Sequence, residues 1–455
     1  MFGFWRHSSK RAWLLLQRRL RTASPPSVLA FGYGVLILLG SGLLKLDVAR
    51  TAPLSWLEAL FTASSAVTVT GLVVVDTGSH FTLFGQLVIA LLIQAGGLGF
   101  MTFAILTLLN LGKRLGLRQQ LIALEAFNQT SFVSIRQVAR SVLLYAGLIE
   151  LIGWLLLTWR WSFDMSWPQA AYQGVFYTIS AFNNAGFALS ADSLSRYVGD
   201  IPVNLIITLL FIIGGLGFVV LQDITLNRGR WRKLRSYSRL MIVGTLTLNL
   251  ICWALFFLFE HANPATLGQL PLKDQLVAAW FQAVTPRTAG FNTLPIEHLT
   301  DASSLLTLML MFIGGGSVST ASGIKLGTIM VVMVAVHAFL RQHDQVTVGY
   351  RSIPQALVMK ALAVMVISSM LAFFASLILT WLMPSPLLDC VFEVVSALGT
   401  VGLSRGLTGQ LTPPAQLLIM LVMFAGRLGP LTLAYVIAVP KQQRIKYPKV
   451  DVLIG

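Results

Sequence analysis

Charged residues are scarce in this chain. Asp, Glu, Lys and Arg make up 11% of its 455 residues, whereas soluble domains carry about 25%. Together with a hydrophobic fraction of 56% and a mean hydropathy of +0.76, this scarcity excludes a soluble globular domain and predicts a polytopic membrane protein. The net charge of +16 comes from basic clusters between apolar runs, which is the pattern of the positive-inside rule and not of nucleic-acid binding.

Cysteine and histidine are scarce as well. The two cysteines, Cys252 and Cys390, lie in or beside apolar runs, so we expect no disulfide framework. The six histidines are scattered and no nucleotide-phosphate loop is present, so we predict no enzyme and no covalently bound cofactor. Residues 1–27 are basic and lack a signal-peptide apolar core; we expect them to form a cytoplasmic arm near anionic lipid headgroups.

Eight apolar stretches reach the length of about 20 residues that a membrane-spanning helix needs. A shorter helix-like run, such as 53–65 or 386–397, lies inside each pair of stretches and is too short to cross the bilayer. The predicted fold class is an all-α integral membrane protein with eight transmembrane helices and four re-entrant pore helices. The stretches are 28–46, 82–110, 137–159, 202–226, 239–260, 303–339, 356–383 and 415–439.

The charges between the stretches predict the orientation. Basic residues follow the second, fourth, sixth and eighth stretches, so we expect these connections and both termini on the cytoplasmic side. The segments around the re-entrant runs carry mostly acids. These acids would give the outer mouth a potential that attracts cations, or they reflect only the absence of a basic bias on that side; both interpretations stay open. They are Asp76, Asp164, Asp192, Asp200, Glu260, Asp274, Glu297, Asp301 and Asp389.

A glycine-centred motif follows each re-entrant run. Ten residues before its glycine stand the aromatics Phe61, Phe176, Trp280 and Phe392, and six before it stand Ser65, Ser180, Val284 and Ser396. A second, glycine-rich motif recurs further on, at 96–99, 214–217, 314–317 and 426–429. The first motif comprises Thr68, Val69, Thr70 and Gly71; Asn183, Asn184, Ala185 and Gly186; Arg287, Thr288, Ala289 and Gly290; and Gly399, Thr400, Val401 and Gly402.

The chain is therefore predicted to contain four copies of one unit, at 28–118, 136–235, 236–345 and 352–440, followed by a cytoplasmic tail at 441–455. Extended backbone at membrane depth is tolerated only where it is buried or lines a wet cavity. There, carbonyls can replace the water around a dehydrated cation such as K⁺, and glycine permits positive φ and close backbone approach. The four motifs predict a ring that selects ions by backbone carbonyls.

Two departures from the fourfold pattern predict a gate. The sixth stretch is interrupted at 314–323 by small and polar residues, which predicts an unwound loop below the ring, unless they serve close helix packing. Arg427 stands where the other units have glycine, far from either helix end, so we expect it to face the interior. It would bond the loop or act as an electrostatic barrier. The gate residues are Gly314, Gly315, Gly316, Ser317, Ser319, Thr320, Ser322, Gly323 and Arg427.

These motifs resemble the Trk/Ktr/HKT superfamily of potassium transporters over nearly the whole chain, and within it the KtrB-type ion-translocating subunit. The resemblance implies K⁺ uptake across the bacterial cytoplasmic membrane, a filter in which Gly71 favours K⁺ over Na⁺, and an intramembrane gate loop with an arginine at position 427. It also implies a homodimer, stimulation by Na⁺ and a cytoplasmic KtrA-type regulatory ring that binds ATP or ADP. The rival interpretation is a secondary transporter of another cation or solute, which predicts inverted repeats; a passive membrane scaffold leaves the fourfold motif unexplained.

Overall fold

The computed structural model describes residues 25–99, 135–348 and 351–429. Its regular secondary structure in these residues is helical, apart from one short antiparallel pair of strands, β1 (Thr347–Val348) and β2 (Arg351–Ser352). The predicted class, an all-α membrane protein, is confirmed. Most of the expected N-terminal arm, the tail at 441–455 and the ends of the stretches 82–110 and 415–439 lie outside the described residues.

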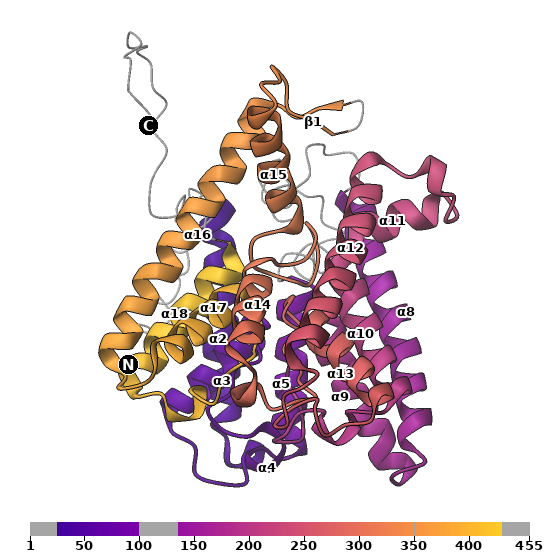
Figure 1. Ribbon diagram of the computed structural model, residues 1–455. Helices are drawn as coiled ribbons and strands as arrows, with labels where there is room; N and C mark the ends of the chain where they lie inside the picture. The colour runs from indigo at the N-terminus through magenta and orange to yellow at the C-terminus, as the bar shows by residue number, and fades with distance from the viewer. Residues whose placement is uncertain (1–24, 100–134, 349–350, 430–455) are drawn as a thin grey trace, which may run out of the picture.

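Four groups of three helices make up the bundle, each with one long helix of 20–28 residues followed by two shorter helices of 12–16 residues (Figure 1). The 15-residue helix α15 (Leu326–Leu340) follows the third group. Shorter helices connect the remaining elements: η1 (Asp47–Ala49), α4 (Thr77–His80), η3 (Ser195–Tyr197), α11 (Phe218–Leu226), η4 (Trp231–Lys233), η5 (Ile296–His298) and η6 (Thr408–Gln410). The groups are α2 (Pro25–Leu44), α3 (Trp56–Thr68) and α5 (Leu83–Gly97); α8 (Ile135–Trp161), α9 (Trp167–Phe182) and α10 (Ile201–Leu216); α12 (Ser236–Glu260), α13 (Leu272–Val284) and α14 (Asp301–Phe312); and α16 (Gln355–Leu382), α17 (Leu387–Gly399) and α18 (Pro413–Leu428).

Local sequence explains where several helices begin. Ser55 and Glu58 form a capping box at the start of α3, with the Ser55 amide donating to Glu58 Oε2 at 2.7 Å and the Glu58 amide donating to Ser55 Oγ at 3.2 Å. Thr82 caps α5 and Thr300 caps α14 through their hydroxyls. Asp200 caps α10, where a proline follows in the first turn.

The helices of the structure match the eight predicted membrane-spanning stretches only in part. Among the described residues, four helices, α2, α8, α12 and α16, are long and apolar enough to cross a membrane. The predicted fourth stretch, 202–226, is not one straight helix, because α10 and α11 meet at an angle of 93°. The bend falls at Gly217, whose φ of 103° is accessible to glycine and strained for other residues. The sixth stretch is interrupted as predicted, between α14 and α15.

The hydrophobic core interlocks the four groups. Each of the four larger apolar clusters is built mainly from one group and contains a buried aromatic from the middle helix of the next group: Phe176 of α9 in the first, Phe281 of α13 in the second, Phe392 of α17 in the third and Phe61 of α3 in the fourth. Each cluster also contains the residue after the next group's motif glycine. Because every group packs on its neighbour in this way, the bundle closes into a cycle.

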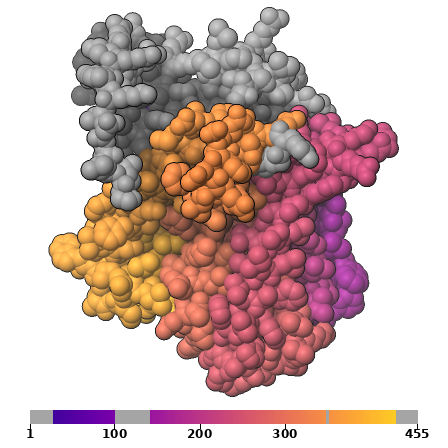
Figure 2. Space-filling view, turned by 45° about the horizontal axis from the view of Figure 1, so that its top comes forward, coloured from indigo at the N-terminus to yellow at the C-terminus, as the bar shows by residue number. Residues whose placement is uncertain are grey.

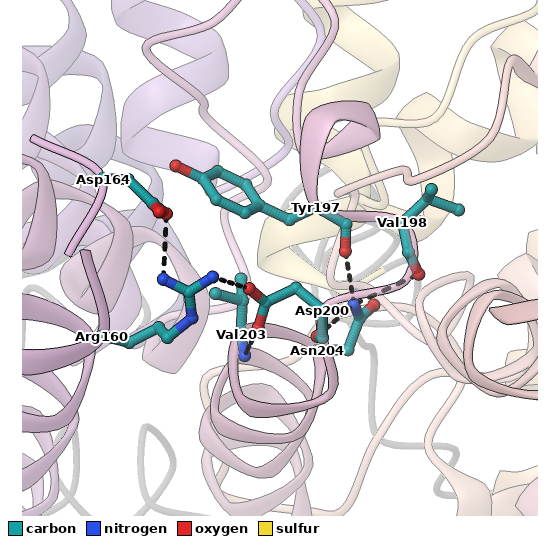
Figure 3. Close-up of polar contacts among 7 residues, drawn as sticks. All are labelled: Arg160, Asp164, Tyr197, Val198, Asp200, Val203 and Asn204. Atoms are coloured by element: carbon teal, nitrogen blue, oxygen red, sulfur yellow. Dashed lines mark hydrogen bonds and ion pairs between the residues drawn. The ribbon is translucent and has the colours of Figure 1, made fainter. Parts of the chain in front are cut away.

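A polar network holds the outer end of the second group (Figure 3). Arg160, at the end of α8, donates to Asp164 at 2.9 Å and also to Asp200, which in turn accepts from the Val203 amide at 2.9 Å. Asn204 Nδ2 donates to the Tyr197 carbonyl at 2.7 Å. The network ties the end of α8, the η3 turn and the start of α10 together, and so fixes the loop that leads from the second motif back into the bundle.

Candidate functional site

The four motif glycines meet at the centre of the bundle. A Cβ added to any of them would collide with the carbonyl oxygen that precedes the glycine of the next motif. Gly71 lies against the Ala185 carbonyl, Gly186 against that of Ala289, Gly290 against that of Val401, and Gly402 against that of Thr70. The four segments therefore form a closed ring in sequence order, with backbone against backbone at every junction.

The backbone conformation is the same in all four segments. Each glycine has positive φ, as does the residue two positions earlier. Positive φ at every second residue distinguishes these segments from an extended strand, in which φ is negative throughout. Positive φ costs about 1–3 kcal/mol at a non-glycine position, so the fold maintains strain here. The φ angles are 58° and 91° at Val69 and Gly71, 60° and 68° at Asn184 and Gly186, 75° and 78° at Thr288 and Gly290, and 50° and 95° at Thr400 and Gly402.

The motif side chains point into the protein. Thr68, Thr70, Asn183, Ala185, Thr288, Ala289 and Val401 are 0% exposed, and Val69, Asn184 and Thr400 are 1% exposed. Differences between the four sequences are therefore absorbed by the surrounding core. On the inner side of the ring, the four segments therefore have only their backbone in common.

Hydroxyl groups hold the segments from behind. Ser65 Oγ accepts from the Gly71 amide at 3.0 Å, and Ser396 Oγ accepts from the Gly402 amide at 3.1 Å. Ser180 Oγ instead donates to the Phe187 carbonyl at 2.8 Å. These three serines are the ones that the sequence places six residues before the glycine.

The third segment is anchored one residue later than the sequence alignment expected. Thr285, and not Val284, supplies the hydroxyl, which donates to the Phe291 carbonyl at 2.6 Å. The buried aromatic is likewise Phe281, which is 0% exposed, and not the half-buried Trp280. Aligning the motifs on the glycine without a gap concealed this shift, although the Phe281 and Thr285 side chains one position along carried the signal.

An outer cavity of about 430 Å³ opens above the ring, lined by all four glycines and by the residues that follow three of them, Leu72, Phe187 and Leu403. Asp76, Asp192 and Glu297 line it, and no lysine or arginine is among its lining residues. Most other predicted outer acids have structural partners: Asp164 and Asp200 pair with Arg160, and Asp389 pairs with Arg405 at 2.7 Å. Three acids therefore line the cavity, and one of them, Asp76, also caps α4 by accepting from the Ser79 amide at 2.8 Å.

The segment between α14 and α15 lies below the ring and is packed against the end of α10. The Gly316 amide donates to the Gly215 carbonyl at 2.7 Å, and the Thr320 amide donates to the Gly214 carbonyl at 3.2 Å. The Phe218 amide, at the start of α11, donates to the Val318 carbonyl at 2.8 Å. The predicted loop 314–323 is therefore an ordered, non-helical segment, and the bend between α10 and α11 is built around it.

Arg427 reaches this loop from the last turn of α18. Its Nη1 donates to the Thr320 carbonyl at 2.7 Å and to Ser322 Oγ at 2.9 Å. Its Nη2 donates to the Gly96 carbonyl and, at 3.1 Å, to that of Gly97. The guanidinium thus joins the loop of the third group to the end of α5 in the first group. It does not pair with a carboxylate within the described part of the chain.

The loop also contacts the ring directly. The side-chain amide of Asn184 lies between two hydroxyls, Thr320 Oγ1 at 3.0 Å and Thr288 Oγ1 at 3.1 Å. Thr320 Oγ1 also donates to the Phe182 carbonyl at 3.1 Å. Since the Thr320 carbonyl accepts from Arg427, a single loop residue connects the second and third ring segments to the arginine.

Arg287, predicted as part of the ring, directs its side chain behind the ring and not into the outer cavity. It is 8% exposed, and its Nη1 donates to Asn249 Oδ1 at 2.9 Å. Its Nε has no hydrogen-bond partner among the described residues. The guanidinium is therefore a buried positive charge on the third side of the ring, where the other segments carry neutral residues.

A polar cluster behind the second segment, formed by the buried Asn183 and the half-buried Gln94 and Glu150, was missed from the sequence. Gln94 Nε2 donates to both carboxylate oxygens of Glu150, at 2.9 and 3.0 Å. Asn183 Nδ2 donates to Gln94 Oε1 at 2.7 Å and to Glu150 Oε1 at 3.2 Å. The signal was available, because Glu150 is the acid in the middle of the apolar stretch 137–159, where ionisable residues are rare.

A closed bundle of apolar helices around a backbone-lined ring, with a water-accessible cavity on one side, defines an integral membrane transport protein. The family described as cation transport protein (TrkH) matches residues 20–447. The chain belongs to this family.

Individual relatives agree with this assignment. The chain is 48% identical over 432 residues to the Ktr system potassium uptake protein B of Bacillus subtilis, covering 95% of this chain and 97% of that protein. It is 33% identical over 451 residues to the potassium/sodium uptake protein NtpJ of Enterococcus hirae, covering 97% and 100%. The crystal structure of the potassium transporter TrkH from Vibrio parahaemolyticus has the same fold, with a TM-score of 0.73 at 20% identity, covering 92% of this chain and 86% of that one.

Proposed function

We propose that the chain takes up K⁺ across the membrane through the ring centred on Gly71, Gly186, Gly290 and Gly402. The observation that carries this proposal is the closed ring, in which each glycine lies against a carbonyl of the next segment. Backbone carbonyls in such a ring replace the hydration shell of a dehydrated cation. The three acids of the outer cavity raise the local cation concentration in front of it. The names of both relatives include potassium uptake.

We further propose that the loop 314–323 is a gate that Arg427 holds closed. The four hydrogen bonds of the guanidinium and the contact between Thr320 and Asn184 support this role. Opening would require the loop to leave Arg427 and the end of α10 together. The unit boundaries 28–118, 136–235, 236–345 and 352–440 belong to the same proposal, with one ring segment in each unit.

The assembly and its regulation are also proposals. The Bacillus subtilis relative is named as component B of a Ktr system, which supports a partner subunit; with the family resemblance, we propose a homodimer controlled by a KtrA-type cytoplasmic ring that binds ATP or ADP. The Enterococcus hirae name includes sodium and supports Na⁺ as an activating ion. We place the protein in the bacterial cytoplasmic membrane with both termini inside.

Growth of a potassium-uptake-deficient bacterium at low external K⁺ tests the ring. Gly71→Ser and Gly290→Ser each place a side chain against a carbonyl of the neighbouring segment at a positive φ, so we expect both to abolish or strongly reduce growth. Gly147→Ser is the matched control, because this glycine is exposed on α8 and a Cβ there meets nothing within 4 Å. Normal growth of both ring variants, at normal membrane expression, would overturn the assignment.

A further inference from the structure

A basic and aromatic surface lies where α10 bends into α11. Leu226 at the end of α11 is 67% exposed, and Trp231 in η4 is 47% exposed. Arg228, Arg230 and Arg232, together with Lys233, are exposed around them. The one acid of this region, Asp223, is buried and accepts from the Arg235 amide at 2.8 Å. The surface therefore presents positive charge and two large apolar side chains, with no exposed carboxylate between residues 225 and 236.

The position of this surface matches the edge of the bilayer. α11 lies at 93° to α10, so if α10 crosses the membrane, α11 runs close to the membrane plane. In Figure 1 it projects sideways at the end of the bundle that carries α15 and β1, opposite α4 and the outer cavity. Figure 2 shows the same segment protruding from the flank. A helix in this position meets lipid headgroups first.

We propose that the segment from Leu226 to Lys233 binds anionic phospholipid headgroups. Four basic side chains supply the charge complementarity, and the exposed tryptophan and leucine supply the apolar side chains that enter the interface. A soluble protein partner would explain the charges but not the exposure of Leu226 and Trp231 on the flank of the bundle. The membrane is therefore the occupant that both sets of side chains fit.

The bound lipid would act on the gate, a consequence that rests on the proposed function. The first residue of α11, Phe218, is hydrogen-bonded through its amide to the Val318 carbonyl of the loop. A Cβ on Gly217 would lie 2.5 Å from the Ser317 carbonyl, so the bend and the loop are in direct backbone contact. Lipid that holds α11 at the headgroup level therefore fixes one wall of the gate.

Lipid retention tests the binding site without reference to transport. The purified full-length protein is equilibrated with phosphatidylglycerol, and the lipids bound to it are counted by native mass spectrometry. In one variant Arg228, Arg230, Arg232 and Lys233 are all changed to Gln; in a second, Trp231→Ser removes only the aromatic anchor. We expect the first variant to lose phosphatidylglycerol affinity by about fivefold for each charge removed, and the second to lose less. The matched control is the double variant Arg341→Gln, Arg351→Gln, whose bases are also exposed but belong to the segment after α15 and to β2, outside α11 and η4.

Uptake of labelled rubidium into vesicles then tests the link to the gate. Vesicles of phosphatidylcholine with and without phosphatidylglycerol are compared, and we expect the lipid dependence to vanish in the fourfold variant and to persist in the control. Unchanged lipid retention in the fourfold variant overturns the binding site. Lost stimulation by a regulatory subunit, with lipid retention intact, assigns the surface to a protein partner and also overturns it. Lost retention without any change in uptake refutes the link to the gate alone. All six substituted bases are exposed, so the variants are expected to fold, and size-exclusion profiles check this.

Discussion

Removing the Arg427 side chain is expected to increase K⁺ uptake in the absence of activating partners. Two of its hydrogen bonds end on the loop, at the Thr320 carbonyl and at Ser322 Oγ. A hydrogen bond to a charged group contributes about 1.5–3 kcal/mol, so Arg427→Ala removes about 3 kcal/mol or more that favours the closed loop. Since 1.4 kcal/mol corresponds to a factor of ten, the open population would rise by roughly 100-fold.

Ser322→Ala separates the two roles considered for Arg427. It removes one bond to the loop, worth about 1.5 kcal/mol, and keeps the positive charge. If the arginine holds the loop, uptake rises by roughly tenfold; if the arginine acts only as an electrostatic barrier, uptake does not change. The assay is rubidium uptake into proteoliposomes without nucleotide or regulatory subunit. Wild-type uptake in both Arg427→Ala and Ser322→Ala would refute the reasoning, because neither the hydrogen bonds between Arg427 and the loop nor an electrostatic barrier at Arg427 would then limit flux.

Three further predictions concern stability and geometry. Phe281→Ala should lower the free energy of unfolding by about 3–5 kcal/mol, and Trp280→Ala should lower it clearly less. Thermal unfolding in detergent measures both, and equal losses would contradict the shifted register. Gly217→Ala should lower both stability and uptake, because it adds a Cβ at φ 103° against a loop carbonyl, whereas Gly229→Ala, where a Cβ meets nothing, should cost only the strain of positive φ. Glu150→Ala should destabilise by about 1.5–3 kcal/mol and Glu150→Gln, which keeps an acceptor, by less; identical melting temperatures would show that the polar cluster is not needed.

The fourfold motif was sufficient to predict the ring, and the reason is physical. The ring is built from backbone, and backbone conformation at its centre depends on one residue type, since glycine alone combines positive φ with close approach. The four glycines were therefore visible although the residues around them differ. The break in the sixth stretch could also be predicted, because a run of small and polar residues at membrane depth is tolerated as unwound backbone only where it is buried in protein or lines a water-filled cavity.

Features that depend on contacts between units could not be predicted in the same way. The third anchor lies at Thr285 because the buried face of α13 selects Phe281, a choice that the ungapped alignment on Gly290 concealed. The bend at Gly217 depends on the loop of the next unit, whose Val318 carbonyl accepts from the Phe218 amide. The sequence of the second unit predicted one straight helix at 202–226, because the loop residue that stabilises the bend, Val318, lies about a hundred residues further on.

The departures from the fourfold pattern lie in three of the four units. The third unit carries the loop and the buried Arg287, the fourth carries Arg427, and the second carries the bend and Asn184; the loop contacts Arg427, Asn184 and the bend. A change in α11 or in the loop therefore reaches the ring through Thr320, whose hydroxyl contacts Asn184 of the second segment, and Asn184 in turn contacts Thr288 of the third. Thr320→Val keeps the carbonyl and the shape but removes the hydroxyl. If the loop acts on the ring itself, this variant should change the ratio of K⁺ to Na⁺ uptake; if the loop is only a plug, total flux should change at a constant ratio. A constant ratio would restrict the loop to gating and leave selectivity to the backbone ring.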